Sequence, residues 1–162
     1  VLGAPILEEL LKAGYLFYLL RRNRIGFMVD GAIDGFAVGA GFALVETMVY
    51  LGSLTGASVF VWVLRGLGTA VMHSGATAIV GTVAAAISDQ KRRRDWTVFV
   101  PGLLIAIAIH IAFNSGILPP AETAAFTLVA IPPILQLIFV RNEKRLEKWL
   151  TSEMDQELEL IT

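Results

Sequence analysis

The sequence predicts an all-α, polytopic transmembrane helix bundle with a polar cluster buried at one depth. The chain of 162 residues is 56% hydrophobic and has a mean hydropathy of +0.69, which is too apolar for an ordinary soluble domain. Its apolar runs are long enough to cross a bilayer. Ionisable side chains interrupt several of these runs, and such side chains are costly inside a membrane unless they serve structure or function.

Five apolar runs are candidate membrane spans. A helix rises about 1.5 Å per residue, so about 20 apolar residues cross the roughly 30 Å of hydrocarbon. The runs extend from Val1 to Leu20, Ile25 to Gly52, Val59 to Ile87, Trp96 to Asn114 and Thr123 to Val140. We therefore expect residues 1–140 to form a bundle of about five spans. The chain begins inside an apolar run, so we also expect further sequence before Val1.

Residues 141–162 form a polar tail, which we expect on the cytoplasmic side. Four apolar residues in the tail could form one stripe of a surface helix, namely Leu146, Trp149, Leu150 and Leu158. A solvated tail is the alternative. In the preceding span, Pro132 and Pro133 are expected to kink the helix, because proline removes backbone hydrogen bonds.

The basic residues predict the orientation of the bundle. All thirteen Lys and Arg residues except Lys12 and Arg65 fall in three clusters, after the first, third and fifth runs. The clusters are Arg21, Arg22 and Arg24; Lys91 to Arg94; and Arg141, Lys144, Arg145 and Lys148. Basic loops stay on the cytoplasmic side, so the loops alternate between the inner and the outer side, as five antiparallel spans require. We therefore expect a multi-pass protein of the plasma membrane. Lys12 and Arg65 lie inside spans and need partners or access to the interface.

Both histidines of the chain and three glutamates lie at a similar depth inside the spans. They are Glu8, Glu9, Glu46, His73 and His110. Counted from the outer ends of their spans, Glu46 and His110 lie roughly 9 Å deep and Glu9 roughly 12 Å deep. His73 reaches this layer if Arg65 extends to the outer surface and residues 59–64 belong to the outer connection.

Helical spacing indicates which side chains share a face, because residues three or four apart are neighbours on a helix. Both Glu8 and Glu9 can reach Lys12. Phe42 lies one turn before Glu46, and Asn114 lies one turn after His110. Arg65, Thr69 and His73 form one stripe, and Gly31, Gly35 and Gly39 form a small-residue seam that permits close helix packing. Asp30 and Asp34 lie nearer the inner surface, where we expect capping or pairing with the basic loop.

Four motifs carry a resemblance to a known family. They are EELLK (Glu8 to Lys12), GFALVE (Gly41 to Glu46), RGLGTAVMH (Arg65 to His73) and HIAFN (His110 to Asn114). Their order and their placement on four successive spans resemble the PrsW-type intramembrane proteases, which are related to the CAAX-processing protease and bacteriocin-immunity membrane superfamily. The resemblance covers roughly Pro5 to Ser115. Two features depart from it: family members usually have more spans before the EExxK helix, and Thr47 stands where Asn is common.

The resemblance implies a glutamate-type endopeptidase that cleaves single-span or lipid-anchored membrane proteins near the outer face, as family members cleave anti-sigma factors. It favours Glu8 as the base that activates water and Glu9 as the structural partner of Lys12. Glu46 could orient a water molecule or a histidine.

Peptide hydrolysis also needs donors that stabilise the developing oxyanion. His73 and His110 are candidates for this role or for proton transfer, while Asn114 could orient His110 or donate its own amide.

Two alternatives stay open. A metal-dependent hydrolysis would hold a divalent metal such as zinc with Glu8, His73 and His110, although the sequence has no HExxH motif; the glutamate scheme needs no cofactor. A non-enzymatic proton-coupled carrier or immunity-type scaffold could use the same polar residues, but a carrier is expected to show an internal repeat, and no convincing repeat is present. The net charge of −1 gives no reason to expect a nucleic-acid partner, whereas membrane lipids are expected ones.

Overall fold

The computed structural model describes residues 3–51, 58–91, 93–115, 117 and 119–161. This part of the chain forms five α-helices and one short 3-10 helix and contains no strand. In chain order they are α1 (Gly3–Arg21), α2 (Met28–Leu51), α3 (Val59–Lys91), η1 (Trp96–Phe99), α4 (Val100–Asn114) and α5 (Pro120–Ile161). The prediction of an all-α membrane bundle is therefore confirmed.

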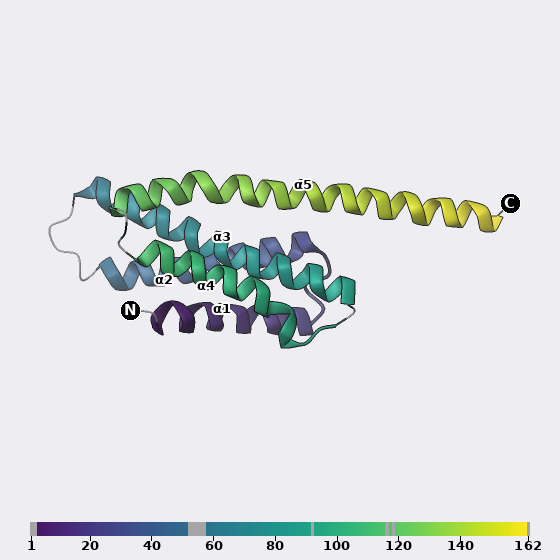
Figure 1. Ribbon diagram of the computed structural model, residues 1–162, viewed down its shortest axis with the longest axis horizontal. Helices are drawn as coiled ribbons and strands as arrows, with labels where there is room; N and C mark the ends of the chain where they lie inside the picture. Colours follow the sequence, from purple (N-terminus) through teal and green to yellow (C-terminus); the bar gives the residue numbers. More distant parts are fainter. Residues whose placement is uncertain (1–2, 52–57, 92, 116, 118, 162) are drawn as a thin grey trace.

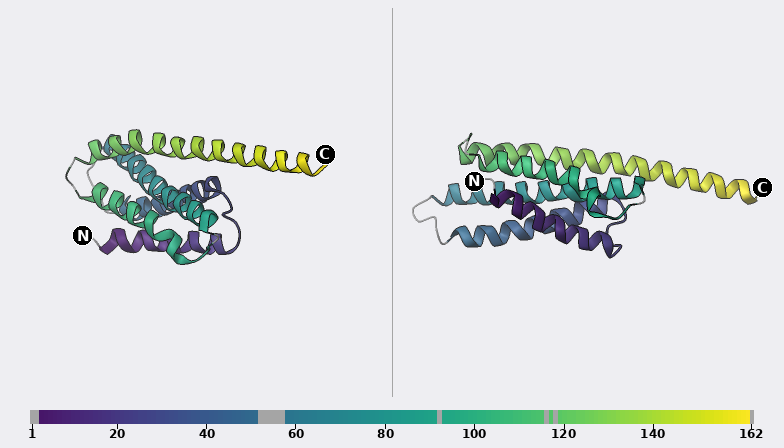
Figure 2. Two further views of the ribbon diagram at one scale, coloured as in Figure 1. Left: turned by 45° about the vertical axis from the view of Figure 1, so that its right-hand side comes forward. Right: turned by 60° about the horizontal axis from the view of Figure 1, so that its bottom comes forward.

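The helices alternate in direction, which gives the bundle two distinct ends (Figure 1). The start of α1, the end of α2, the start of α3 and the end of α4 lie together, and we call this the Glu8 end. The connections from α1 to α2 and from α3 to α4 lie at the opposite end, which we call the Arg21 end. The three views show α3 packed among the other helices, with α5 along one side of the bundle and α1 along the other (Figures 1 and 2).

Three helical segments are long and apolar enough to cross a membrane, namely Met28–Tyr50, Arg65–Gln90 and Trp96–Asn114. The shorter apolar stretch Glu122–Leu137 lies in α5, and α1 carries charged residues in its first half. These two segments remain predicted spans. The candidate span within α3 is Arg65–Gln90, and residues 59–64, predicted as part of the outer connection, form the helical start of α3.

The helix α5 runs without interruption from Pro120 to Ile161. At about 1.5 Å per residue it is roughly 63 Å long, about twice the thickness of the hydrocarbon. Pro132 and Pro133 lie inside it and are both exposed, and Figure 1 shows no sharp bend where the sequence predicted a kink. Residues 141–161 continue this helix beyond the bundle (Figure 1).

Glycines bring the backbones of α2 and α3 into direct contact. A β-carbon added at Gly31 would lie 2.3 Å from the Gly81 carbonyl oxygen, and one added at Gly39 would lie 2.3 Å from the His73 carbonyl oxygen. No side chain fits in either place, because real β-carbons essentially never approach so closely. The predicted seam thus sets the distance between α2 and the segment of α3 that carries His73.

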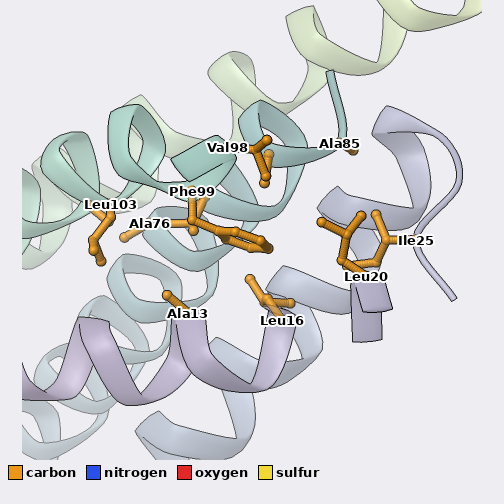
Figure 3. Packing of buried hydrophobic residues seen from close by; sticks show 12 residues of the cluster. Ala13, Leu16, Leu20, Ile25, Ala76, Ala85, Val98, Phe99 and Leu103 are labelled. Carbon is orange, nitrogen blue, oxygen red and sulfur yellow. The ribbon is translucent and has the colours of Figure 1, made fainter. Parts of the chain in front are cut away.

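Large apolar side chains fill the Arg21 end. Leu16 and Leu20 of α1 are 0% and 1% exposed, and Phe99 of η1 is 0% exposed. Figure 3 shows Ala13 and Leu16 of α1 facing Phe99 and Leu103. The ring of Phe17 adds edge-on contacts with Trp96 and Phe99 at centroid distances of 5.4 and 6.0 Å, a favourable aromatic arrangement.

Two aspartates cap helices at the Arg21 end. The backbone N–H groups of Gly26 and Phe27 donate to Asp30 Oδ2 at 3.0 and 2.8 Å, so Asp30 has a structural role. Asp95 accepts from the backbone N–H of Thr97 at 2.9 Å at the start of η1. The Thr97 hydroxyl and the Arg93 guanidinium also bind Asp95 and hold the pKa of its carboxyl below the ordinary range.

Candidate active site

Lys12 lies at the centre of a buried polar cluster at the Glu8 end. Its side chain is 2% exposed, and its ammonium donates to Glu9 Oε1 at 2.5 Å and to His73 Nδ1 at 2.8 Å. The ammonium nitrogen also lies 4.7 Å from the centroid of the Phe42 ring, a distance that permits a cation–π interaction. Partners from α1, α2 and α3 therefore surround the ammonium and stabilise its charge at this depth.

The contact with Lys12 determines the tautomer of His73. An ammonium group can only donate, so Nδ1 of His73 accepts and Nε2 carries the proton. That Nε2–H donates to Glu46 Oε2 at 2.7 Å. Of the two roles predicted for Glu46, contact with a histidine is the one that the structure describes.

Glu9 joins α1 directly to α4. Its Oε1 atom, which already accepts from Lys12, lies 2.8 Å from His110 Nδ1. A carboxylate accepts here and His110 donates, which leaves the lone pair of His110 Nε2 available to another group. An unbroken chain of hydrogen bonds thus runs from Glu46 through His73, Lys12 and Glu9 to His110.

Glu8 stands at the end of this chain. Its Oε2 atom lies 3.6 Å from His110 Nε2 and has no hydrogen-bond partner among the described residues, although the atom is buried. Glu9 Oε2 is buried and unpartnered in the same part of the chain. Buried polar atoms without partners are rare and point to a water molecule, an ion or a ligand as the missing partner.

Aromatic side chains fix the two histidines against each other. The rings of His73 and His110 are nearly perpendicular, with centroids 4.7 Å apart, and the ring of Phe42 lies 5.3 Å from that of His73. Both histidines are essentially buried, at 0% and 1% exposed. They are consequently held in one arrangement by packing as well as by hydrogen bonds.

A cavity of about 630 Å³ opens beside the cluster. Glu46 and His73 form part of its wall, which connects the cavity to the hydrogen-bonded chain. The other lining residues come from the ends of α2 and α4, the start of α3 and the segment leading into α5: Thr47, Tyr50, Trp62, Arg65, Gly66, Thr69, Met72, Phe113, Asn114, Ile117, Pro119 and Thr123.

The structure brings most of the predicted site residues together and places the others in the cavity wall. Asn114 is the last residue of α4 and lines the cavity, but among the described interactions it is Glu9 that holds the ring of His110. Arg65 and Thr69 also line the cavity, outside the hydrogen-bonded chain. Asp34 lies on α2 in the half that starts at the Arg21 end, away from the cluster.

Several features of the site were not predicted. The link from Glu9 to His110 joins residues 101 positions apart, and no local pattern indicates it. Trp62 and Met72 were missed as cavity residues, although each lies three or four positions from a predicted member of the same stripe. Thr77 is buried one turn after His73, and its hydroxyl has no hydrogen-bond partner among the described residues.

Glu8, His73 and His110 are the residues that could hold a metal ion. One ligand atom from each lies within 4.8 Å of the others, and two histidines with one carboxylate are a typical ligand set for catalytic zinc. The buried Oε2 atom of Glu8 is available, and so is Nε2 of His110, whose Nδ1–H is held by Glu9 as metal-binding histidines usually are.

The charges of the cluster also fit a divalent cation. With neutral histidines, Glu8, Glu9 and Glu46 outweigh the single ammonium of Lys12, which leaves an excess of two negative charges that a divalent ion would neutralise. Both ring nitrogens of His73 have partners. His73 could therefore bind a metal only if its hydrogen bond to Lys12 or the one to Glu46 were broken.

Comparison with known proteins identifies the family. The family model described as PrsW family intramembrane metalloprotease matches residues 1–140, which include every residue of the cluster. No curated protein and no solved structure gives a significant match. The match spans most of the chain, and three helices of the described residues are long and apolar enough to cross a membrane. The chain therefore belongs to the PrsW family of intramembrane proteases and is an integral membrane protein.

Proposed function

We propose that this protein hydrolyses peptide bonds of membrane-anchored proteins with a water molecule that Glu8 activates. The position of Glu8 carries the proposal: its buried Oε2 atom lacks a partner among the described residues and lies 3.6 Å from Nε2 of His110. A water molecule between these atoms would meet two acceptors, and a carboxylate in a water-poor site is a suitable general base.

The proposed reaction moves one proton twice. Glu8 takes a proton from water while the water oxygen bonds to the carbonyl carbon. When the C–N bond breaks, the departing nitrogen receives this proton and leaves as an amine, and the other product is a carboxylic acid, which then loses its own proton to the amine or to solvent. Asn114, which lines the same cavity as His73, is the proposed donor to the oxyanion.

The remaining members of the cluster position the reacting groups. Glu9 holds the ring of His110 and neutralises Lys12, so it serves as a structural partner of both. Glu46 holds the ring of His73. A rigid arrangement of this kind supports catalysis, because misplacement of a reacting group by about 1 Å can cost about 100-fold in rate.

A metal-dependent form is the alternative: Glu8, His73 and His110 would hold a divalent metal such as zinc, and the ion rather than Glu8 would then activate the water. When bound, such an ion supplies Lewis acidity, which polarises a carbonyl and makes water more acidic. The ligand set, the excess negative charge and the description of the family support this form.

The proposed substrate is a single-span or lipid-anchored protein that presents an unwound segment near the outer face of the plasma membrane. A helical peptide bond is shielded by its own backbone, so the segment must be extended where it is cut. The cavity lies at the Glu8 end, and the proposal assigns this end to the outer side of the membrane because basic loops stay on the cytoplasmic side. Cleavage of anti-sigma-factor-like proteins and the relation to the CAAX proteases remain predictions of the motif resemblance.

The arrangement of the cluster favours hydrolysis over proton transport. Its ionisable side chains converge at one end of the bundle beside a cavity, whereas a relay would extend along the path through the membrane.

The proposal is tested with the protein reconstituted in lipid vesicles together with single-span substrates. Glu8→Gln is expected to lower kcat/KM by about 100- to 10,000-fold, because it removes the general base. His73→Ala and His110→Ala should also abolish most cleavage. Glu122→Gln is the matched control, because Glu122 is exposed and lies in the first turn of α5 at the same end of the bundle.

Metal dependence is measured in the same vesicles. If the metal-dependent form is the active one, a chelator should stop cleavage, added zinc should restore it, and protein-bound zinc should fall in the Glu8, His73 and His110 variants; the glutamate scheme predicts that a chelator has no effect. Undiminished cleavage by all three variants would end the assignment. If Glu46→Gln abolishes cleavage while Glu8→Gln does not, Glu46 is the base.

A further inference from the structure

The cavity extends along one face of α3 from the cluster towards Arg65. Trp62, Arg65, Thr69, Met72 and His73 all line it. Trp62, Arg65 and Thr69 follow one another at intervals of three or four positions, and Met72 and His73 lie three and four positions after Thr69. All five therefore occupy one side of the helix. The arginine and the buried histidine therefore belong to the same cavity wall.

Arg65 gives this cavity a distinct charge pattern. Among the described residues that line the cavity, Arg65 is the only Lys or Arg and Glu46 is the only carboxylate. Glu46 is bound to His73, whereas Arg65 is exposed and forms no ion pair among the described residues. A guanidinium binds a carboxylate through two parallel hydrogen bonds, and the low dielectric near a membrane strengthens the contact.

The spacing on α3 relates Arg65 to the proposed reaction centre. Arg65 and His73 are eight positions apart, which corresponds to about 12 Å along a helix. An extended peptide covers about 3.3 Å per residue. A substrate strand with its scissile bond at the cluster would therefore bring a residue three or four positions away to the guanidinium.

We infer that Arg65 forms a specificity subsite that binds an acidic side chain three or four residues from the scissile bond. This inference rests on the proposed function. A lipid phosphate is the competing ligand, but Arg65 shares its cavity with Glu46 and His73, and Thr69 of the same cavity wall lies between Arg65 and His73 along α3. The side of the scissile bond on which the acidic residue lies is an outcome of the experiment.

The subsite is tested with extended peptides that differ at one position. Glu is compared with Gln at each of six positions on either side of the cleavage site, in kcat/KM for the wild type and Arg65→Gln. The wild type should prefer Glu about ten- to hundredfold at a position three or four residues from the bond, as expected for a charge-assisted pair. Arg65→Gln should reduce this ratio to about one, and Arg65→Glu should favour Lys there instead.

A binding measurement separates failure of the subsite from failure of the proposed chemistry. The same peptides are labelled with a fluorophore, and their dissociation constants are measured with Glu8→Gln and with the double variant Glu8→Gln/Arg65→Gln. Binding to these two variants does not depend on turnover. The Glu peptide should bind about tenfold or more tightly than the Gln peptide only when Arg65 is present. Peptides that show this preference but are not cleaved by the wild type would overturn the proposed function and leave the subsite standing.

Arg93→Gln is the matched control, because Arg93 is exposed and pairs with Asp95 at the opposite end of the bundle; it should leave the ratio unchanged. Equal effects of Arg65→Gln on the Glu and Gln peptides would overturn the subsite. The same holds if the effect of Arg65→Gln depends on the share of phosphatidylglycerol in the vesicles and not on the peptide, which would identify Arg65 as a lipid ligand.

Discussion

The two halves of α1 bury opposite kinds of side chain. Near its start, Glu9 and Lys12 are 1% and 3% exposed and form a chain of hydrogen bonds with histidines of α3 and α4. Near its end, Leu16 and Leu20 are equally buried against an apolar core. A single helix thus contributes reactive groups at the Glu8 end and packing at the Arg21 end.

This division has a physical reason. Buried ions contribute little net stability, since desolvation opposes their attraction, but losing one partner is costly. Burying apolar side chains carries no such desolvation cost, and close packing stabilises them. We infer that the Arg21 end stabilises the bundle and thereby allows the Glu8 end to hold a cluster selected for chemistry.

The largest effect on stability is expected from Lys12→Met, which removes the ammonium and leaves Glu9 charged and buried. The free energy of unfolding should fall by about 3–5 kcal/mol, the typical cost of breaking one side of a buried ion pair. Thermal or denaturant unfolding in lipid bicelles measures the change. Lys144→Met is the control, because Lys144 is exposed on α5.

A second substitution sharpens this result. Glu9→Gln in the Lys12→Met background removes the unpaired charge, while the amide oxygen can still accept from His110. The double variant should recover at least half of the lost stability. Unchanged stability of Lys12→Met alone would mean that Glu9 is neutralised by another group, and the ion pair would lose its assigned role.

The next largest effect is expected from Gly39→Ala. Its β-carbon would lie 2.3 Å from the carbonyl oxygen of His73, so α2 and α3 must separate and the ring of His73 must move. We expect kcat/KM to fall by about 100-fold, as a displacement of about 1 Å can cause, with a smaller loss of stability.

Gly41→Ala is the matched control for this change. A β-carbon at Gly41 meets nothing within 4 Å, although Gly41 lies on the same helix and only two positions away. Equal activity of the two variants would show that the position of His73 does not depend on the glycine seam.

The sequence predicted the members of the cluster because charge inside an apolar run is conspicuous. Glu8, Glu9, Lys12, Glu46, His73 and His110 were identified in this way; helical spacing placed both Glu8 and Glu9 within reach of Lys12, and the structure pairs Lys12 with Glu9. The same local rules predicted the contact of Phe42 with the site, because it lies one turn before Glu46. Helical periodicity therefore predicts the depth of each polar residue in its span and the face of the helix on which it lies.

Periodicity does not determine which helices are neighbours. The contact between Glu9 and His110 depends on the packing of α1 against α4, which no pattern within either helix encodes. Two other predictions were wrong: Pro132 and Pro133 lie in a continuous α5, and residues 59–64, predicted as part of the outer connection, extend α3 as a helix. Each proline removes one donor from the helix and crowds the carbonyl four positions before it, but the other backbone hydrogen bonds of α5 keep the helix continuous through the pair.

The smallest of these effects is expected from Leu16→Ala, which tests the stabilising role of the Arg21 end. In soluble cores this type of change costs about 2–5 kcal/mol. Here we expect about 2 kcal/mol, because an unfolded helix in lipid keeps an apolar environment and loses mainly its packing contacts. Unfolding in bicelles measures the cost, and cleavage per folded molecule should stay within about twofold of the wild type.

Leu11→Ala is the control on the same helix, because Leu11 is 62% exposed while Leu16 is 0% exposed. It should change stability by no more than about 0.5 kcal/mol. An equal cost for both variants would mean that lipid contact stabilises α1 as much as the apolar core does. A loss of activity in Leu16→Ala beyond its loss of folded protein would show that the two ends are coupled, since the packing of Leu16 would then help to position Glu8 through the shared helix.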